Sequence, residues 1–125
     1  MKVLVVDDSK LARMAVAKVL SAVHPGWTRI EAANADEALV QVKTADPDIA
    51  VFDFNMPGRD GLDLAAEVRS LKPNMQVAII SANHQQEVVD RAIALGAVFL
   101  SKPITEKALT DFLDVAEKKL KAVGR

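Results

Sequence analysis

The chain has 125 residues, half of them hydrophobic, and its 16 Lys and Arg nearly balance its 17 Asp and Glu, giving a formal net charge of −1. This length fits one domain, residues 1–125, that can fold without disulfides, and the absence of Cys excludes thiol catalysis and Cys-ligated metal sites. The balanced charge argues against a nucleic-acid footprint, and no apolar run approaches the ~18 residues of a membrane span, so we expect a cytoplasmic protein that binds neither nucleic acid nor membrane directly.

Five short apolar runs, mostly rich in Val, Ile and Phe, alternate with longer segments along the chain. Their length and composition predict β-strands. Met1 stands directly before the first run, which indicates a natural start. The expected strands are Lys2–Val6, Thr28–Ala32, Ile49–Phe52, Val77–Ile80 and Val98–Leu100.

A segment with apolar residues at helical spacing follows each run, with charged residues on its other side. Asn34, three residues before Glu37, is a loose form of the N-terminal capping box. Pro47, Pro73 and Gly96 stand where helices should have ended. Alternating strands and helices predict an α/β domain with a parallel sheet covered on both faces. The expected apolar faces are Ala12, Val16, Val19 and Val23; Ala38, Leu39 and Val42; Leu64, Val68 and Leu71; Val89, Ala92 and Ile93; and Leu109, Phe112, Ala116 and Leu120.

Side chains capable of chemistry follow four of the five runs. In open α/β sheets, ligands bind beyond the carboxyl ends of the strands. We therefore expect polar groups from four separate segments to gather at one edge of the sheet. They are Asp7 and Asp8 after the first run, Asp53 after the third, Ser81 after the fourth, and Ser101 with Lys102 after the fifth.

Three carboxylates at one edge need a compensating positive charge, because one pair ~4 Å apart costs on the order of 4 kcal/mol at an effective dielectric constant of about 20. With oxygen ligands and no Cys, the natural candidate is a hard divalent cation such as Mg²⁺. Lys102 offers a mobile cation for a phosphate, and Ser81 a hydroxyl donor. An Asp can itself act as a nucleophile and form an acyl phosphate.

Together these residues resemble the receiver domain of two-component response regulators, specifically its stand-alone, chemotaxis-type form. The resemblance implies a flavodoxin-like, five-stranded parallel sheet of order 2-1-3-4-5 flanked by five helices. It also implies a signalling phosphoprotein that is not an enzyme, although it carries intrinsic autophosphorylation and autodephosphorylation chemistry. The motifs that carry it span nearly the whole chain: Asp7-Asp8, Asp53 with Asn55-Met56-Pro57 and Asp60-Gly61-Leu62, Ser81-Ala82 and Lys102-Pro103.

The resemblance assigns a role to each acidic residue. Asp53 is the expected phosphoacceptor, supplied by a sensor histidine kinase, a phosphotransfer protein or a small phosphodonor. Asp8 and Asp53 would ligate Mg²⁺ through their carboxylates, and Asn55 through its backbone carbonyl. Asp7 would act through a water molecule.

The resemblance also implies a switch. Lys102 would pair with the phosphoryl oxygens, Ser81 would move to hydrogen-bond one of them, and Phe99 would turn inward as Ser81 moves. The Lys102–Pro103 peptide bond is often cis in the family. The surface for a downstream target would lie on the fourth helix (residues 87–95), the fifth strand and the last helix. Arg59 stands where relatives often have Met and adds a charge near the site.

Other interpretations remain open at this point. A phosphorelay intermediate and a phosphate sink fit the same motifs. An Asp-nucleophile phosphatase is less favoured, because Asp53-Phe54-Asn55 lacks a second carboxylate two residues on. Asp7-Asp8 alone suits an ordinary turn, and Phe99 alone suits a plain core position. His24 and His84 are expected to face solvent.

Overall fold

The computed structural model describes residues 1–82 and 85–123, so His84 lies outside the described residues. Five parallel strands form one sheet in the order β2-β1-β3-β4-β5, which confirms the predicted α/β class and the order 2-1-3-4-5. Within the described residues, no helix is long and apolar enough to span a bilayer. The elements are β1 (Lys2–Val6), α1 (Lys10–Val23), β2 (Thr28–Ala32), α2 (Ala35–Ala45), β3 (Ile49–Asp53), α3 (Gly61–Leu71), β4 (Gln76–Ser81), α4 (Gln86–Ala94), β5 (Val98–Ser101) and α5 (Glu106–Ala122).

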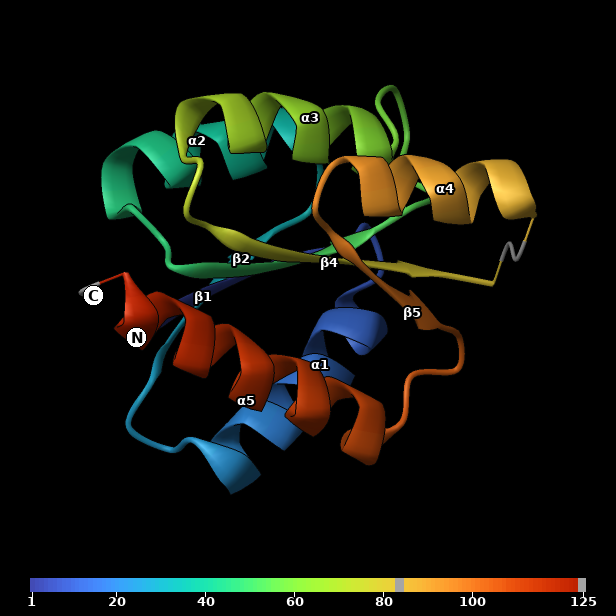
Figure 1. The fold of residues 1–125 in the computed structure, drawn as a ribbon. Helices are drawn as coiled ribbons and strands as arrows, with labels where there is room; N and C mark the ends of the chain where they lie inside the picture. The colour runs from blue at the N-terminus through green and yellow to red at the C-terminus, as the bar shows by residue number, and fades with distance from the viewer. Residues whose placement is uncertain (83–84, 124–125) are drawn as a thin grey trace.

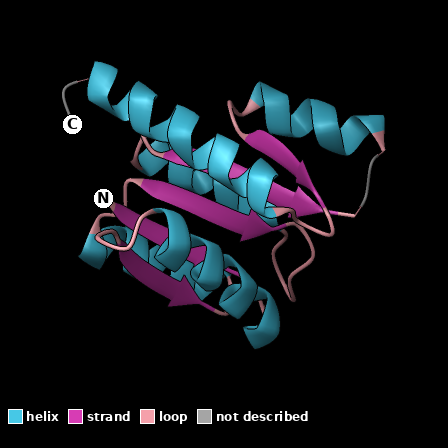
Figure 2. Ribbon diagram, turned by 90° about the horizontal axis from the view of Figure 1, so that it is seen from below, coloured by secondary structure: helices cyan, strands magenta, loops and turns pink. Residues whose placement is uncertain are grey.

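The sheet is covered on both faces, with α2, α3 and α4 on one side and α1 and α5 on the other (Figure 1). Figure 2, which views the sheet from below, shows the strands running in one direction. Successive residues of a strand point to opposite faces, so each central strand supplies both cores. Leu4, Phe52 and Ile79 pack on the α2–α4 side, whereas Val5 and Val51 pack on the α1–α5 side.

Polar side chains begin four of the five helices. Each accepts a hydrogen bond from a backbone N–H in the first turn, a contact worth about 1 kcal/mol. The pairs are Ser9 with Ala12, Asn34 with Glu37, Asp60 with Asp63, and Thr105 with Ala108. The Glu37 carboxylate also accepts from the Ala33 amide at 3.2 Å, so the predicted capping interaction is present, displaced by one residue.

The expected apolar face of α4 is wrong at Ile93 and omits the buried Val88. Val88 and Ala92 are buried, whereas Val89 is half-buried and Ile93 is 64% exposed. Residues 88 and 92 have the same helical spacing as residues 89 and 93, so periodicity alone does not choose between the two stripes. The direction in which α4 lies on the sheet makes that choice.

His24 is half-buried, so the expectation that it faces solvent is wrong. The turn after α1 folds back, and the Trp27 amide donates to the His24 carbonyl at 3.0 Å. The two rings stack with centroids 3.7 Å apart. His24 Nε2 also lies 3.7 Å from Asp114 Oδ1 on α5.

Candidate functional site

The carboxyl ends of β1 and β3 bring three carboxylates together. Asp7 follows β1 and Asp53 ends β3, and strand alternation directs both to the side of the sheet that carries α1 and α5. One carboxylate oxygen from each of Asp7, Asp8 and Asp53 lies within 4.8 Å of the other two. Asp7 and Asp53 are only 6% and 3% exposed, whereas Asp8 is exposed. The predicted acidic cluster is therefore present, and two of its three members are buried.

Lys102 brings a positive charge to this cluster. Its Nζ lies 2.9 Å from Asp53 Oδ1, and in the described part of the chain this buried oxygen has no other recorded polar partner. Burial lowers the pKa of Lys102, but its contact with Asp53 and the charges of Asp53, Asp7 and Asp8 outweigh burial and leave the pKa raised. One ammonium group does not balance three carboxylates. The donor set and the poorly satisfied Asp53 oxygen therefore fit a hard divalent cation.

The surroundings of Asp7 fix the position of its carboxylate but disfavour its ionised form. Burial raises the pKa of Asp7, the hydrogen bond from the Ser9 amide to Asp7 Oδ1 at 2.9 Å lowers it, and the charge of Asp53 raises it again. The net pKa is above the ordinary value of 3.8. A folded-state pKa that is raised means that protonation of Asp7 favours folding.

Replacing Asp7 by Asn is expected to stabilise the metal-free protein by about 1 kcal/mol at neutral pH. Protonated Asp7 stabilises the fold relative to ionised Asp7. This contribution is fully present below the pKa of Asp7 in the unfolded chain and is lost as pH rises through its higher pKa in the folded protein. Ionised Asp7 therefore costs stability that Asn avoids, and the advantage of Asn should shrink as pH falls toward about 4. Urea unfolding in EDTA across this range measures the effect. A variant less stable than wild type at neutral pH would contradict it.

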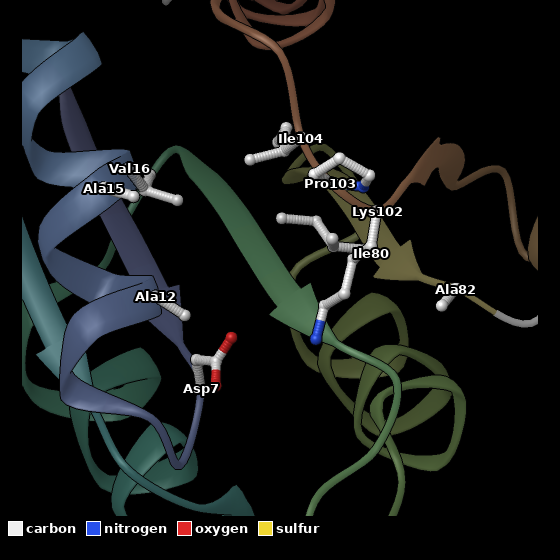
Figure 3. Close-up of a pocket in the computed structure, with 9 residues that line it drawn as sticks. All are labelled: Asp7, Ala12, Ala15, Val16, Ile80, Ala82, Lys102, Pro103 and Ile104. Carbon is white, nitrogen blue, oxygen red and sulfur yellow. The ribbon is translucent and has the colours of Figure 1, made fainter.

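Two hollows flank the acidic cluster. One, of about 550 Å³, lies between α1 and the segment after β5, and apart from Asp7 and Lys102 its lining is apolar. Figure 3 shows the Asp7 carboxylate and the Lys102 ammonium group pointing into this space. The other, of about 380 Å³, is lined by residues that include Asp8 and Asn55. The predicted Asn55 thus lines the same hollow as Asp8.

The predicted switch residues share one face of the sheet. Ser81 is 1% exposed at the end of β4, and its carbonyl accepts from the Lys102 amide at 3.1 Å. Alternation puts Ser81 and the half-buried Phe99 on the face covered by α2, α3 and α4, where Phe99 packs against the core. The Lys102–Pro103 bond is cis, as the resemblance implied.

Arg59 is turned toward α3. Its guanidinium lies 3.0 Å from a Glu67 carboxylate oxygen and donates to the Asp63 carbonyl at 3.2 Å. Two residues of one helix therefore each accept a hydrogen bond from the Arg59 guanidinium. The positive charge of Arg59, which the sequence predicted near the site, therefore contacts α3.

Three residues that support the site were not assigned a role from the sequence. The Ser9 amide holds Asp7, and Arg13 Nη1 donates to the Asp7 carbonyl. The Gly61 amide donates to the Phe54 carbonyl at 2.9 Å, against the backbone of Asp53. The sequence does offer signals for two of them: Ser9 precedes a segment with apolar residues at helical spacing, as a helix N-cap does, and Gly61 belongs to the motif Asp60-Gly61-Leu62. Arg13 carried no local signal, because its contacts join segments that are distant in sequence.

Comparison with known proteins agrees with this geometry. The family model described as "Response regulator receiver domain" matches residues 3–114. The chemotaxis protein CheY of Thermotoga maritima is 33% identical over 119 residues, which cover 94% of this chain and 98% of that protein. The structure of CheY4 from Vibrio cholerae is 30% identical and superimposes with a TM-score of 0.82, covering 92% of this chain and 97% of that one.

Other relatives are longer proteins. A protein-glutamate methylesterase/protein-glutamine glutaminase of Rhodospirillum rubrum is 41% identical over 104 residues, which cover 82% of this chain but 28% of that protein. The glycerol metabolism activator of Pseudomonas putida is 36% identical over 115 residues, 90% of this chain and 52% of that protein. The chain thus spans about a quarter and a half of these two relatives.

Proposed function

Because the chain belongs to the response regulator receiver domain family of two-component signalling, we propose that it is a single receiver domain, residues 1–125, switched by phosphorylation of Asp53. One observation carries this proposal. The buried Asp53 carboxylate lies 2.9 Å from the Lys102 ammonium group and within 4.8 Å of the carboxylates of Asp7 and Asp8. A nucleophile, a cation for phosphoryl oxygens and a cation-binding acidic pair thus occupy one edge of the sheet.

The proposed metal is Mg²⁺. Asp8 and Asp53 would bind it through their carboxylates and Asn55 through its backbone carbonyl, with Asp7 acting through water. When bound, Mg²⁺ offsets the negative charge that accumulates between the acidic cluster and an incoming phosphoryl group. The buried Asp53 oxygen, whose one recorded polar partner among the described residues is Lys102, supports this assignment.

The proposed reaction is a phosphoryl transfer. A carboxylate oxygen of Asp53 attacks the phosphorus of the donor, for example a phosphohistidine, and forms a new P–O bond as the P–N bond breaks. The bonding electrons leave with the imidazole nitrogen, which takes up a proton if it departs as the neutral ring. Lys102 moves from the Asp53 carboxylate to a phosphoryl oxygen, and the Ser81 hydroxyl donates to another.

The proposed output is a change in a protein-binding surface. Phosphorylation of Asp53 replaces one negative charge by about two and adds acceptor oxygens beside Lys102 and Ser81. These new contacts bias a two-state equilibrium that includes Phe99. A downstream target would bind α4, β5 and α5, where Ile93, Val98 and Val115 are exposed. We place the protein in the cytoplasm, with a histidine kinase or phosphotransfer protein upstream.

Intact-mass spectrometry of the wild-type chain tests the proposal. With acetyl phosphate and Mg²⁺, we expect one phosphoryl group to be added per chain, and with EDTA none, because the metal offsets the like charges of donor and acidic cluster. Beryllofluoride should give a matching Mg²⁺-dependent complex. The absence of any Mg²⁺-dependent adduct would overturn the proposed function. Multiple turnover of a phosphate ester would instead favour a phosphatase.

Replacing Lys102 by Ala is expected to uncouple phosphorylation from output. The variant should still accept a phosphoryl group, but without the cation the exchange protection of β5 and α5 should change at least fivefold less than in wild type. Hydrogen exchange with and without beryllofluoride measures this response. Lys107→Ala is the matched control, because Lys107 pairs with Asp111 on the surface of α5 and lies 85% exposed. An unchanged response in Lys102→Ala would contradict its assigned role.

A further inference from the structure

The guanidinium of Arg13 joins three segments beside the acidic cluster. From the first turns of α1, its Nη1 donates to the carbonyl oxygen of Asp7, at the carboxyl end of β1. Its Nε lies 3.1 Å from Glu31 Oε1 on β2. The Arg13 side chain is only 15% exposed, so these contacts are made mostly out of water. One side chain therefore ties the β1–α1 turn to the neighbouring strand.

Register explains why Glu31 is available for this contact. Val5 on β1 lies opposite Glu31 on β2, and side chains opposite each other in a parallel pair point to the same face. Val5 packs on the face that carries α1 and α5. Glu31 therefore points toward α1, where Arg13 meets it. The next ladder bond, from the Asp7 amide to the Ala32 carbonyl at 3.2 Å, holds the same turn from its backbone side.

The held carbonyl belongs to the peptide unit that links Asp7 to Asp8. Fixing this unit sets the directions in which the two side chains leave the turn, since a peptide unit is planar and rotates as one body. Asp8 is exposed and lies beyond the strand, so its carboxylate depends on the backbone of the turn for its direction. Arg13 thus acts on the positions of two carboxylates without contacting either one in a recorded hydrogen bond within residues 1–82 and 85–123.

We propose that Arg13, held by Glu31, is a positioning residue that sets the divalent-cation affinity of the acidic cluster. This inference rests on the proposed function, because that function assigns Mg²⁺ to the cluster. Residues that orient metal ligands typically change affinity by 10- to 100-fold when they are removed. Because the Glu31 side chain is 38% exposed, its carboxylate stays solvated when the ion pair is lost, so removal of Arg13 should act mainly on the site.

The sign of the effect separates positioning from simple electrostatics. Arg13 carries a positive charge near a cation site, so its removal would strengthen Mg²⁺ binding if charge alone mattered. Positioning predicts the opposite, a weaker affinity. Arg29 supplies the matched control, because it lies 3.4 Å from the same Glu31 but makes no recorded contact with Asp7 in the described chain.

Isothermal titration with MgCl₂ on the intact chain tests the inference. We expect Arg13→Met to weaken Mg²⁺ binding about tenfold. Arg13→Lys, which can still donate to the Asp7 carbonyl, should stay within about threefold of wild type, and Glu31→Gln should weaken binding about threefold. Arg29→Met should bind as wild type does, or slightly more tightly. Thermal unfolding in EDTA checks that each variant is folded.

The possible outcomes distinguish this inference from the proposed function. If the wild type fails to bind Mg²⁺, the metal site of the proposed function is wrong and the role of Arg13 fails with it. If the wild type binds but folded Arg13→Met binds equally or more tightly, only the role of Arg13 is overturned. Should Arg13→Met not fold, Glu31→Gln decides the question, and a wild-type affinity in that variant overturns the inference.

Discussion

Replacing Asp53 by Asn is expected to abolish phosphorylation of the chain completely. The amide group lacks the anionic oxygen that attacks phosphorus, and the other carboxylates of the cluster belong to a different strand end. Asn has nearly the same volume, so it fits the buried position that Asp53 occupies at 3% exposure. Intact mass after incubation with acetyl phosphate and Mg²⁺ should show no adduct in Asp53→Asn at any Mg²⁺ concentration.

A second substitution separates the nucleophile from a metal ligand. Asp8→Asn removes a carboxylate from the same cluster but keeps Asp53. We expect a slower reaction that recovers as the Mg²⁺ concentration rises, because ligand loss weakens affinity without removing the attacking oxygen. Asp36→Asn, an exposed acid in the first turn of α2, should react as wild type does. Persistent Mg²⁺-dependent labelling of Asp53→Asn would show that another residue is the phosphoacceptor.

The strands β1, β3 and β4 were predictable from the sequence because each is an apolar run that is largely buried on both faces. The ends of β1 and β2 agree with the prediction, but β3, β4 and β5 each extend one residue further, to Asp53, Ser81 and Ser101. Backbone pairing continues through these polar residues, since Asp53 lies opposite Ile80 and Ser81 opposite Ser101. The hydropathy of the sequence shows where the apolar core ends, whereas backbone pairing between strands continues until the two backbones diverge. Asp53 and Ser81 are thus the last residues of their strands, whereas Asp7 and Lys102 directly follow theirs.

The candidate site was predictable where its residues follow strands and unpredictable where they cross between elements. Asp7, Asp53 and Lys102 meet because parallel strands end at one edge, a rule that needs only the strand assignments. The Arg13 contact with Glu31 depends on the lateral position of α1 over β2, which no local pattern encodes. The prediction that His24 faces solvent was wrong for a similar reason, because its partners Trp27 and Asp114 lie on a turn and on α5.

Adding one methyl group at Gly61 is expected to destabilise the fold by roughly 2–3 kcal/mol, although helix propensity alone predicts a gain of up to about 1 kcal/mol for Gly→Ala. The structure reverses this sign. A Cβ at Gly61 would lie well under 3.0 Å from the carbonyl oxygen of Asp53 and 3.1 Å from Phe54 Cα. These neighbours are backbone atoms of the strand end that carries the phosphoacceptor, so relief requires the β3–α3 turn to move.

Thermal unfolding of Gly61→Ala should show a midpoint roughly 10 °C below that of wild type. Mg²⁺ affinity should fall as well, because the atoms that must move are those of Asp53. Gly26→Ala is the matched control, since a Cβ there would meet nothing within 4 Å, and we expect it to be neutral or slightly stabilising. If Gly61→Ala unfolds at or above the wild-type midpoint, helix propensity outweighs the close approach, and the turn after Asp53 has enough freedom to absorb a side chain.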